Sequence, residues 1–276
     1  MKKFLASIIA VVLAVSGLSV ISITANAATI FISGNYEYTV NSDDTVNIAG
    51  YKGIATDITI PSQILNKNVV KISANSFYNN STLTSVKIPN TIKVVGSMAF
   101  HNCTKLSKVT LSSNLTKIGY NAFEGTTALT TITIPKTVTT AGNNVFNGSA
   151  LKTATIENGA TAVADNLFSN AKNLTKVTIP NTVKKVGSMS FYHCEKLSSV
   201  TLPNTLTEIG YSAFNGTTAL TTITIPKTVT TAGNNVFNGS ALKTATIENG
   251  ATAVADNLFS NAKNLTKVTI PNTVKK

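Results

Sequence analysis

The sequence predicts a β-rich solenoid, in which short repeats stack their parallel strands along one face and their turns along the other. Leucines and phenylalanines each recur every 22 or 23 residues, and all seven prolines directly follow an Ile or Leu at one point of the repeat. A fixed period of this length is typical of stacked repeat architectures. The leucines are Leu83, Leu106, Leu129, Leu151, Leu174, Leu197, Leu220, Leu242 and Leu265, and the phenylalanines are Phe77, Phe100, Phe123, Phe146, Phe168, Phe191, Phe214, Phe237 and Phe259.

The first 27 residues have the pattern of a secretory signal. Lys2 and Lys3 precede an apolar run from Phe4 to about Val20, and Ala25-Asn26-Ala27 supplies the small residues of a cleavage site. Serines dilute the run and no basic residues follow it, which argues against a membrane anchor. We therefore expect residues 1–27 to be removed, no membrane span in the mature chain, and a secreted or cell-surface location.

Residues 28–53 are expected to form an N-terminal β cap over the first repeat. Two alternating stretches, from Tyr36 to Val40 and from Thr45 to Ala49, flank the turn Asn41-Ser42-Asp43-Asp44. Two such stretches around a polar turn predict a β-hairpin. Its polar outer edge would shield the first rung of the solenoid from solvent.

The solenoid is expected over residues 54–276, with a degenerate first unit at 54–82 and full units from residue 83. In each unit an alternation such as Val86-Lys87-Ile88 predicts a strand with one buried and one exposed face. The proline that follows ends the strand because it has no N–H to donate. On the other face we expect a short second strand, and Gly119–Phe123 predicts a turn and a single helical or 3₁₀ turn.

A longer period accompanies the short one. Residues 125–185 recur without a change as residues 216–276, which is an offset of 91 residues or four units. The block indicates a duplication and suggests that the units are interchangeable. Because the chain stops at Lys276 in the middle of a unit, we expect the last unit to be incomplete and the array to continue beyond it.

Composition argues against several classes of function. Only 12% of the residues are charged, the net charge is +12 at pH 7, and the sequence contains no Arg. Because base readout and phosphate clamps lean heavily on Arg, we do not expect a nucleic acid as a partner. The 11 acidic residues form no pair that recurs on one face, which leaves general acid–base catalysis without candidates.

The two cysteines and two histidines do not form a reactive cluster. Cys103 and Cys194 occupy the same position four units apart, so strand spacing separates them by roughly 19 Å, too far for a disulfide. Each is expected to be a small buried apolar residue. His101 and His193 are similarly distant and are expected at the surface. We therefore expect no catalytic residue, no metal site and no cofactor.

The exposed strand face is the candidate binding surface, because repeat proteins of this kind bind through such sheets. Thr also favours strands and solubility, so its abundance has an equally good structural explanation. Tyr120 and Tyr211 are candidate edge aromatics, because they recur in the loop before a Phe. The candidate binding residues are Lys87, Lys108, Thr110, Thr131, Thr133, Thr153, Thr155, Lys176, Thr178, Thr201, Thr222, Thr224, Thr244 and Thr246.

The succession Ile-Pro, Val-x-x-Ile-Gly, Ala-Phe-x-x-Cys and Leu resembles the BspA-like class of leucine-rich repeats over about residues 54 to 276. The resemblance implies a leucine-rich-repeat solenoid at a cell surface, with adhesion or protein binding as its activity. Two units depart from the pattern, because Glu157 and Glu248 replace Pro while Ala164 and Ala255 replace Gly. These units are candidates for a local change of bend or twist.

Export, the solenoid and the resemblance together favour a monomeric surface protein that binds a host or extracellular protein. An acidic polymer or glycan is a further candidate partner. The alternative is a passive spacer or envelope scaffold that presents a domain missing from this chain, and the identical block favours it because duplication adds length. An ice-binding surface of regular Thr hydroxyls and an enzyme are less favoured hypotheses.

Overall fold

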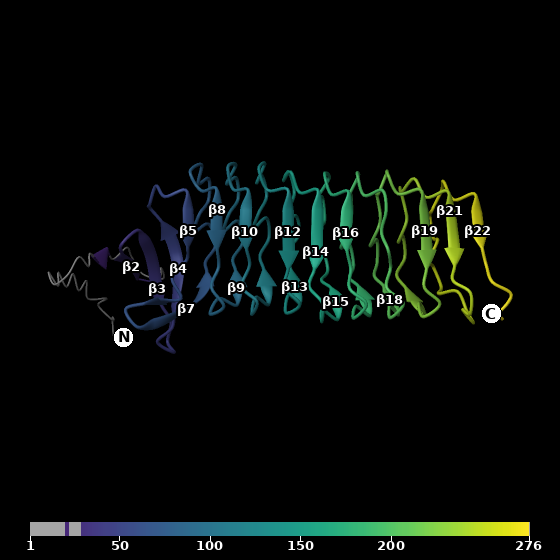
Figure 1. Cartoon of the computed structure of the whole chain (residues 1–276), viewed down its shortest axis with the longest axis horizontal. Helices are drawn as coiled ribbons and strands as arrows, with labels where there is room; N and C mark the ends of the chain where they lie inside the picture. Colours follow the sequence, from purple (N-terminus) through teal and green to yellow (C-terminus); the bar gives the residue numbers. More distant parts are fainter. Residues whose placement is uncertain (1–19, 22–28, 276) are drawn as a thin grey trace, which may run out of the picture.

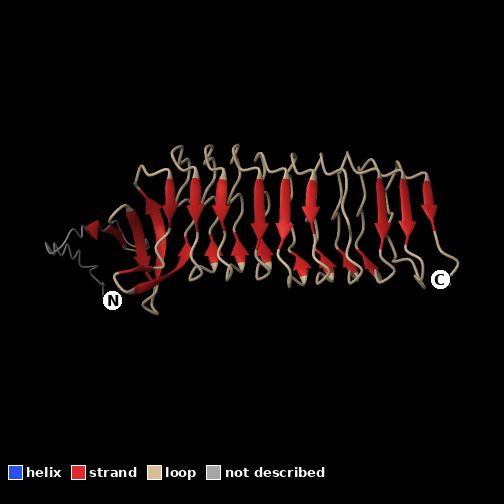
Figure 2. Ribbon diagram, viewed as in Figure 1, coloured by secondary structure: helices blue, strands red, loops and turns tan. Residues whose placement is uncertain are grey.

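The computed structural model describes residues 20–21 and 29–275, so most of the expected secretory signal lies outside the described residues. The described chain is an elongated stack of coils in which successive repeats lie side by side from the cap to the C-terminal end (Figure 1). It is a β-solenoid with strands along both long faces and no helix among the described residues (Figure 2). The predicted fold class is therefore confirmed.

The first long face carries one strand from nearly every repeat. Each strand pairs in parallel with its counterpart one repeat away, as Thr131 does with Thr153 and Thr133 with Thr155. Alternate residues are buried, which is the alternation that the sequence predicts. The strands are β5 (Asp57–Thr59), β8 (Ser85–Lys87), β10 (Lys108–Thr110), β12 (Thr131–Ile134), β14 (Thr153–Ile156), β16 (Lys176–Thr178), β19 (Thr222–Ile225), β21 (Thr244–Ile247) and β22 (Lys267–Thr269).

The second long face carries strands of two residues each. They are also parallel, and every described pair keeps the repeat offset, as in Lys117 with Thr140. The short strands end before the turn that leads to the Phe, so this face is narrower than the first. The strands are β9 (Val94–Val95), β11 (Lys117–Ile118), β13 (Thr140–Ala141), β15 (Ala162–Val163), β17 (Lys185–Val186), β18 (Glu208–Ile209) and β20 (Thr231–Ala232).

The predicted hairpin is present at the N-terminal end. β3 (Tyr36–Val40) and β4 (Val46–Tyr51) pair antiparallel, and β4 then pairs in parallel with β7 (Lys67–Ile72) of the first repeat. The cap thereby continues the second face, whose strand order is β1-β2-β3-β4-β7-β9-β11-β13. The sequence did not predict three further strands of this region, which are β1 (Val20–Ile21), β2 (Ile30–Ser33) and β6 (Gln63–Ile64).

The structure corrects the expected helical turn. The N–H groups of Met98, Phe100 and Asn102 donate to carbonyls of the next repeat at 2.8, 2.8 and 2.7 Å, while those of Ala99 and His101 close turns within their own repeat. Met98 and Asn102 have positive φ angles of 55° and 54°. A helix would need φ to stay negative and its N–H groups to bond internally. Stacking between repeats therefore replaces the helix with a third hydrogen-bonded ladder.

The phenylalanine column forms the centre of the core. Rings of successive repeats stack with centroids from 4.9 Å apart, for Phe77 and Phe100, to 6.0 Å, for Phe237 and Phe259. The rings of Phe100 and Phe123 are within 3° of parallel. Every Phe from 77 to 237 is buried. Each ring from Phe100 to Phe237 lies between two other Phe rings, so the core is continuous along the stack.

The sequence suggested that the glycine four residues before most of the Phe residues forms a turn, but the structure gives it another role. Gly119 has an ordinary backbone conformation, but a Cβ on it would overlap the backbone nitrogen of Ser97 in the preceding repeat. The same overlap with preceding backbone would occur at Gly142 and Gly210. At these positions the residue is glycine because neighbouring backbones touch, whereas Ala164 and Ala255 occupy the column in the two units that lack the glycine.

Candidate binding face

The strand face consists of the outward-pointing residues of the first long face, from the strands β8, β10, β12, β14, β16, β19, β21 and β22 and from the segment Ser199–Thr201. Parallel pairing aligns these residues in two columns, which run along the whole array. The first column is Ser85, Lys108, Thr131, Thr153, Lys176, Ser199, Thr222, Thr244 and Lys267. The second column is Lys87, Thr110, Thr133, Thr155, Thr178, Thr201, Thr224, Thr246 and Thr269.

All fourteen candidate binding residues lie on this face, so the structure brings together the set that the sequence nominated. Thirteen are exposed and Thr244 is half-buried. From Ser85 and Lys87 onward neither column contains an acidic residue, although the exposed Asp57 of β5 pairs with Ser85 and begins the first column. Lys87, Lys108, Lys176 and Lys267 are cationic. The face is thus a grid of hydroxyls with scattered positive charge.

The sheet beneath the strand face is interrupted twice. β10 does not pair with β12, and the equivalent segment Ser199–Thr201 does not pair with β19, so the face divides into sheets ordered β10-β8-β5, β12-β14-β16 and β19-β21-β22. At the second break, Ser199 makes only an isolated bridge to Lys176. In Figure 2 the strand is missing at this repeat, although the chain follows the same path.

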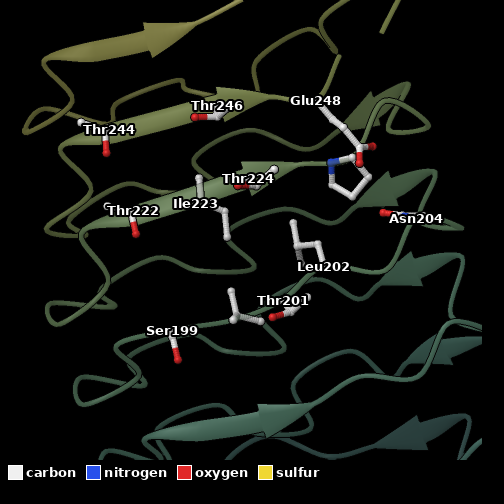
Figure 3. A pocket seen from close by; sticks show the side chains of 12 residues that line it. Ser199, Thr201, Leu202, Asn204, Thr222, Ile223, Thr224, Thr244, Thr246 and Glu248 are labelled. Carbon is white, nitrogen blue, oxygen red and sulfur yellow. The ribbon is translucent and has the colours of Figure 1, made fainter. Parts of the chain in front are cut away.

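A hollow lies at each interruption. The first hollow has a cavity volume of about 430 Å³, and the second has about 480 Å³. The first is lined by Ser107, Lys108, Val109, Thr110, Thr131, Ile132, Thr133, Thr153 and Thr155. The second, drawn in Figure 3, is lined by Ser199, Val200, Thr201, Leu202, Asn204, Thr222, Ile223, Thr224, Pro226, Thr244, Thr246 and Glu248.

The sequence predicted the threonines at the edges of the hollows but not the apolar residues beneath them. Eleven of the fourteen candidates line one hollow or the other, and Lys87, Lys176 and Thr178 line neither. Val109 and Val200 are half-buried, whereas the equivalent Val86 and Val177 are buried. Their partial exposure arises where the ladder is broken. No local residue pattern predicts that break.

The candidate edge aromatics are exposed, as expected. Tyr120 is 59% exposed and Tyr211 is 45% exposed. Their backbone carbonyls accept hydrogen bonds from Met98 and Met189 in the preceding repeats, so both tyrosines belong to the turn ladder. Neither tyrosine lines a hollow. Tyr78, which is 45% exposed, is a further exposed aromatic on the turn side that the sequence did not nominate.

Both cysteines are free and buried, which confirms that expectation. Sγ of Cys103 donates to the carbonyl of Phe77 at 3.1 Å, and Sγ of Cys194 donates to that of Phe168 at 3.2 Å. Burial raises the pKa of the Cys103 thiol to about 12 and that of Cys194 further still. A thiol that stays protonated is a poor nucleophile, so these side chains have a packing role.

His101 is not the surface residue that was expected. Its side chain is 16% exposed and stacks on Tyr78 with ring centroids 4.9 Å apart. Nε2 lies 3.3 Å from a carboxylate oxygen of Glu124, and Glu124 also accepts a hydrogen bond from Asn147 at 2.7 Å. These side chains stack because they occupy one column on successive repeats. His193 is half-buried beside Tyr192.

Residues 20–21 and 29–275 contain no group of three or more His, Cys, Asp or Glu side chains placed to hold a metal ion. Within the same described part of the chain, no helix has the length and apolar character needed to cross a membrane.

The repeats, the stacked Phe core and the open strand face define a leucine-rich-repeat scaffold of non-enzymatic type. The model of the BspA type leucine rich repeat region matches residues 54–175 and 161–276, with six copies. The chain therefore belongs to the BspA-type leucine-rich-repeat family, as the sequence resemblance predicted. Proteins of this family are cell-surface proteins. No curated protein sequence matches the chain.

Two solved structures illustrate the fold. A leucine rich cell surface protein from Faecalibacterium prausnitzii shares 23% identity, with a TM-score of 0.53 over 90% of this chain and 96% of that one. A leucine-rich repeat protein from Bacteroides ovatus shares 24% identity, with a TM-score of 0.54 over 89% of this chain and 77% of that one. At this level of identity the likeness shows the fold alone.

Proposed function

We propose that this protein is exported and binds an extracellular macromolecule through its strand face, in an adhesive role at the cell surface. The observation that carries the proposal is the composition of the face: from Ser85 to Thr269 its columns contain hydroxyls and four lysines, and Asp57 of β5 is the one acidic residue in register with them. Complementary charge of this kind guides association and sets specificity.

Three further observations support export and a surface location. Residues 1–27 have the composition of a secretory signal. The family consists of surface proteins, and the relative from Faecalibacterium prausnitzii is described as a cell surface protein. The free buried cysteines form no bridge, so the fold does not depend on an oxidising compartment and remains compatible with one.

Binding of the mature chain, residues 28–276, to immobilised extracellular matrix proteins tests the proposal. The double variant Lys108→Glu, Lys176→Glu reverses charge on the strand face, and Lys117→Glu, Lys184→Glu makes the same change at exposed lysines outside its two columns. We expect saturable binding that the first variant weakens about tenfold or more and the second leaves unchanged. Equal losses from both pairs would indicate general charge attraction and contradict a role for the face.

The second candidate function is a spacer. The unchanged recurrence of residues 125–185 as 216–276 favours it, because duplication of a whole block adds length without creating a new site. A spacer predicts no saturable binding by the array alone, and predicts that shortening the array changes reach but not affinity. We further propose that the chain has no catalytic activity, since its thiols are buried and its carboxylates are dispersed.

A further inference from the structure

We infer that the two hollows are two copies of one site, that each binds a carboxylate-bearing sugar, and that the strand face is bivalent for an acidic polysaccharide. The inference rests on the proposed function, because it names the ligand class of the same face. It is carried by four observations: the equivalence of the hollows, their lining, the main-chain donors at their edges, and the placement of lysine around them.

The hollows are related by the 91-residue period. Val109, Thr110 and Ile132 of the first correspond to Val200, Thr201 and Ile223 of the second. The rims correspond as well, and the one substitution among the shared lining positions is Lys108 for Ser199. Shared packing and shared sequence therefore produce the same hollow twice. The rim residues of the first hollow are Thr131, Thr133, Thr153 and Thr155, and those of the second are Thr222, Thr224, Thr244 and Thr246.

Each hollow combines an aliphatic floor with a hydroxyl rim. In Figure 3, Ile223 lies among Thr201, Thr222 and Thr224, and Leu202 lies beside Thr201 toward Asn204. A sugar ring has matching chemistry, because its C–H face is apolar while its edge carries hydroxyls that donate and accept hydrogen bonds. The lining contains no aromatic side chain, so the site lacks the large apolar anchor that a protein hot spot would need.

The broken ladder leaves main-chain donors at each hollow. In an intact rung, the N–H groups of Lys152 and Thr153 both donate to the carbonyl of Thr130, at 2.9 and 3.2 Å. At the first break, the corresponding N–H of Thr131, a residue that lines the hollow, makes no main-chain hydrogen bond in the described chain. An N–H group without a main-chain acceptor can donate to an anionic oxygen. Thr222 repeats the arrangement at the second break.

Lysines flank the hollows within the first column of the strand face. Lys108 and Lys176 stand on either side of the first hollow, and Lys176 and Lys267 on either side of the second. Glu248 also lines the second hollow, at the end away from Ser199, Thr222 and Thr244 (Figure 3), and its carboxylate accepts a hydrogen bond from the backbone N–H of Lys227 at 3.0 Å. The first column, at the opposite end, carries Lys108, Lys176 and Lys267, which favours a carboxylate on the bound sugar there.

The separation of the hollows makes the site bivalent. Four strand spacings place equivalent atoms about 19 Å apart along the stack. Both hollows open on one face, so one extended chain can occupy both. Each hollow is shallow and binds weakly alone, but a linked second site raises the overall affinity on the order of a hundredfold or more.

Binding of polygalacturonate by the mature chain tests the inference, with trigalacturonate as the short ligand. Neutral dextran controls for the sugar scaffold, and poly-L-glutamate controls for a carboxylate polymer without rings. The hollow-filling variants are Thr133→Phe and Thr224→Phe, singly and combined. Thr178→Phe is the matched control, because Thr178 is exposed in the same column and lines neither hollow.

We expect polygalacturonate to bind about a hundredfold more tightly than trigalacturonate, and either single filling variant to remove that advantage. The combined variant should bind neither ligand, and Thr178→Phe should behave as wild type. Deletion of residues 125–215 joins the outer repeats in register and leaves one hollow, so it should match the single variants.

Equal binding of dextran or poly-L-glutamate would overturn the inference, as would equal losses from Thr178→Phe and Thr133→Phe. Its failure is distinguishable from failure of the proposed function. Matrix proteins could bind in a way that Lys108→Glu, Lys176→Glu weakens and the hollow-filling variants do not. In that case the face binds its partner outside the hollows. If no probe binds through the face, the proposed function fails as well.

Discussion

At the scale of single residues, Phe168 depends on its two neighbours. Its ring stacks on Phe146 at 5.9 Å and on Phe191 at 5.6 Å, and it is fully buried. Replacing it with Ala opens a cavity that rigid stacked backbones cannot close. We therefore expect Phe168→Ala to lower the free energy of unfolding by about 3–5 kcal/mol, measured by urea denaturation.

Phe259→Ala is the matched control for that change. Phe259 stacks on Phe237 but is only partly buried, so its truncation loses less buried surface. We expect a cost below about 2 kcal/mol. Equal costs at the two positions would contradict a stack in which each ring is stabilised by two neighbours.

The buried thiols predict a dependence of stability on alkaline pH. The pKa of Cys103 rises from an ordinary 9.0 to about 12 because burial disfavours the thiolate. Below pH 9 both folded and unfolded thiols are protonated, so the full stability is present. Between about pH 9 and 12 only the unfolded thiol ionises, and stability falls by up to about 1.4 kcal/mol per pH unit for each thiol.

The variant Cys103→Ser, Cys194→Ser isolates this effect. Serine is a native occupant of the same column, at Ser149 and Ser240, where its hydroxyl donates to a Phe carbonyl at 2.7 Å. We expect the wild type to lose stability more steeply than this variant as pH rises above 9, in urea unfolding at a series of pH values. Parallel pH profiles would show that the thiols are not buried in the folded chain.

At the scale of elements, close contact between backbones fixes the recurring glycine. A Cβ on Gly119 would overlap the backbone of Ser97, which cannot move without breaking the ladder. We expect Gly119→Ala to lower the free energy of unfolding by about 1–3 kcal/mol. Gly148→Asn is the control, because Gly148 has a φ of 64° with free space around it and the equivalent Asn170 has a φ of 60°.

Thermal and urea unfolding of both variants give the comparison. We expect Gly148→Asn to remain within about 0.5 kcal/mol of wild type. The prediction is wrong if the asparagine variant is the less stable of the two, because positive φ and not contact would then limit the glycine positions.

The strands could be predicted and the turns could not, for a physical reason. Alternation such as Ile132-Thr133-Ile134 reports which face is buried, and burial is a property that one repeat already encodes. The ladder through Met98, Phe100 and Asn102 depends on carbonyls of another repeat. A single unit therefore suggests a helical turn, whereas stacking selects alternating φ. Asn and Gly recur two residues before and after most of the Phe residues and were the available signal, whereas Met98, Met189, His193 and Ser212 also adopt positive φ at these positions.

The replacement of proline by Glu157 is likewise explained by contacts with the neighbouring repeat. The N–H of Glu157, which a proline would lack, donates to the carbonyl of Ile134 at 3.0 Å, and its carboxylate accepts from the N–H of Lys136. β14 is thereby paired along four residues with β12. The departure from the family pattern extends the ladder at this repeat.

At the scale of the whole molecule, contacts are made between adjacent repeats, so register is what the array must preserve. Deleting residues 125–215 places Gly216 after Glu124, where Gly125 stands in the native chain, and the following sequence is identical. We expect a folded β-rich protein with a smaller m-value, because less surface is exposed on unfolding. Deleting residues 125–214 leaves one extra residue in that turn and should be clearly less stable.

Circular dichroism and urea unfolding measure both deletions. Misfolding of the in-register deletion would contradict an architecture held together by nearest neighbours. Equal stability of the two deletions would show that the turn ladder tolerates a slip in register, which its alternating φ angles do not allow.

The candidate site was only partly predictable at this scale. Periodicity placed Thr133 and Thr224 on one face because equivalent residues of a solenoid align. The hollows required knowing that β10 and β12 do not pair, and that break is decided by packing between repeats. The sequence does not distinguish the hollows, because their lining residues differ little from the equivalent residues of repeats whose strands pair.

The most direct test of the account is the hydrogen-exchange footprint of polygalacturonate on the mature chain. We expect two regions protected to an equal degree, at 108–110 with 131–134 and at 199–201 with 222–225, while the short strands of the second face exchange as in the free protein. Protection at one region only, or along the second face, would contradict a strand face that carries two copies of one site.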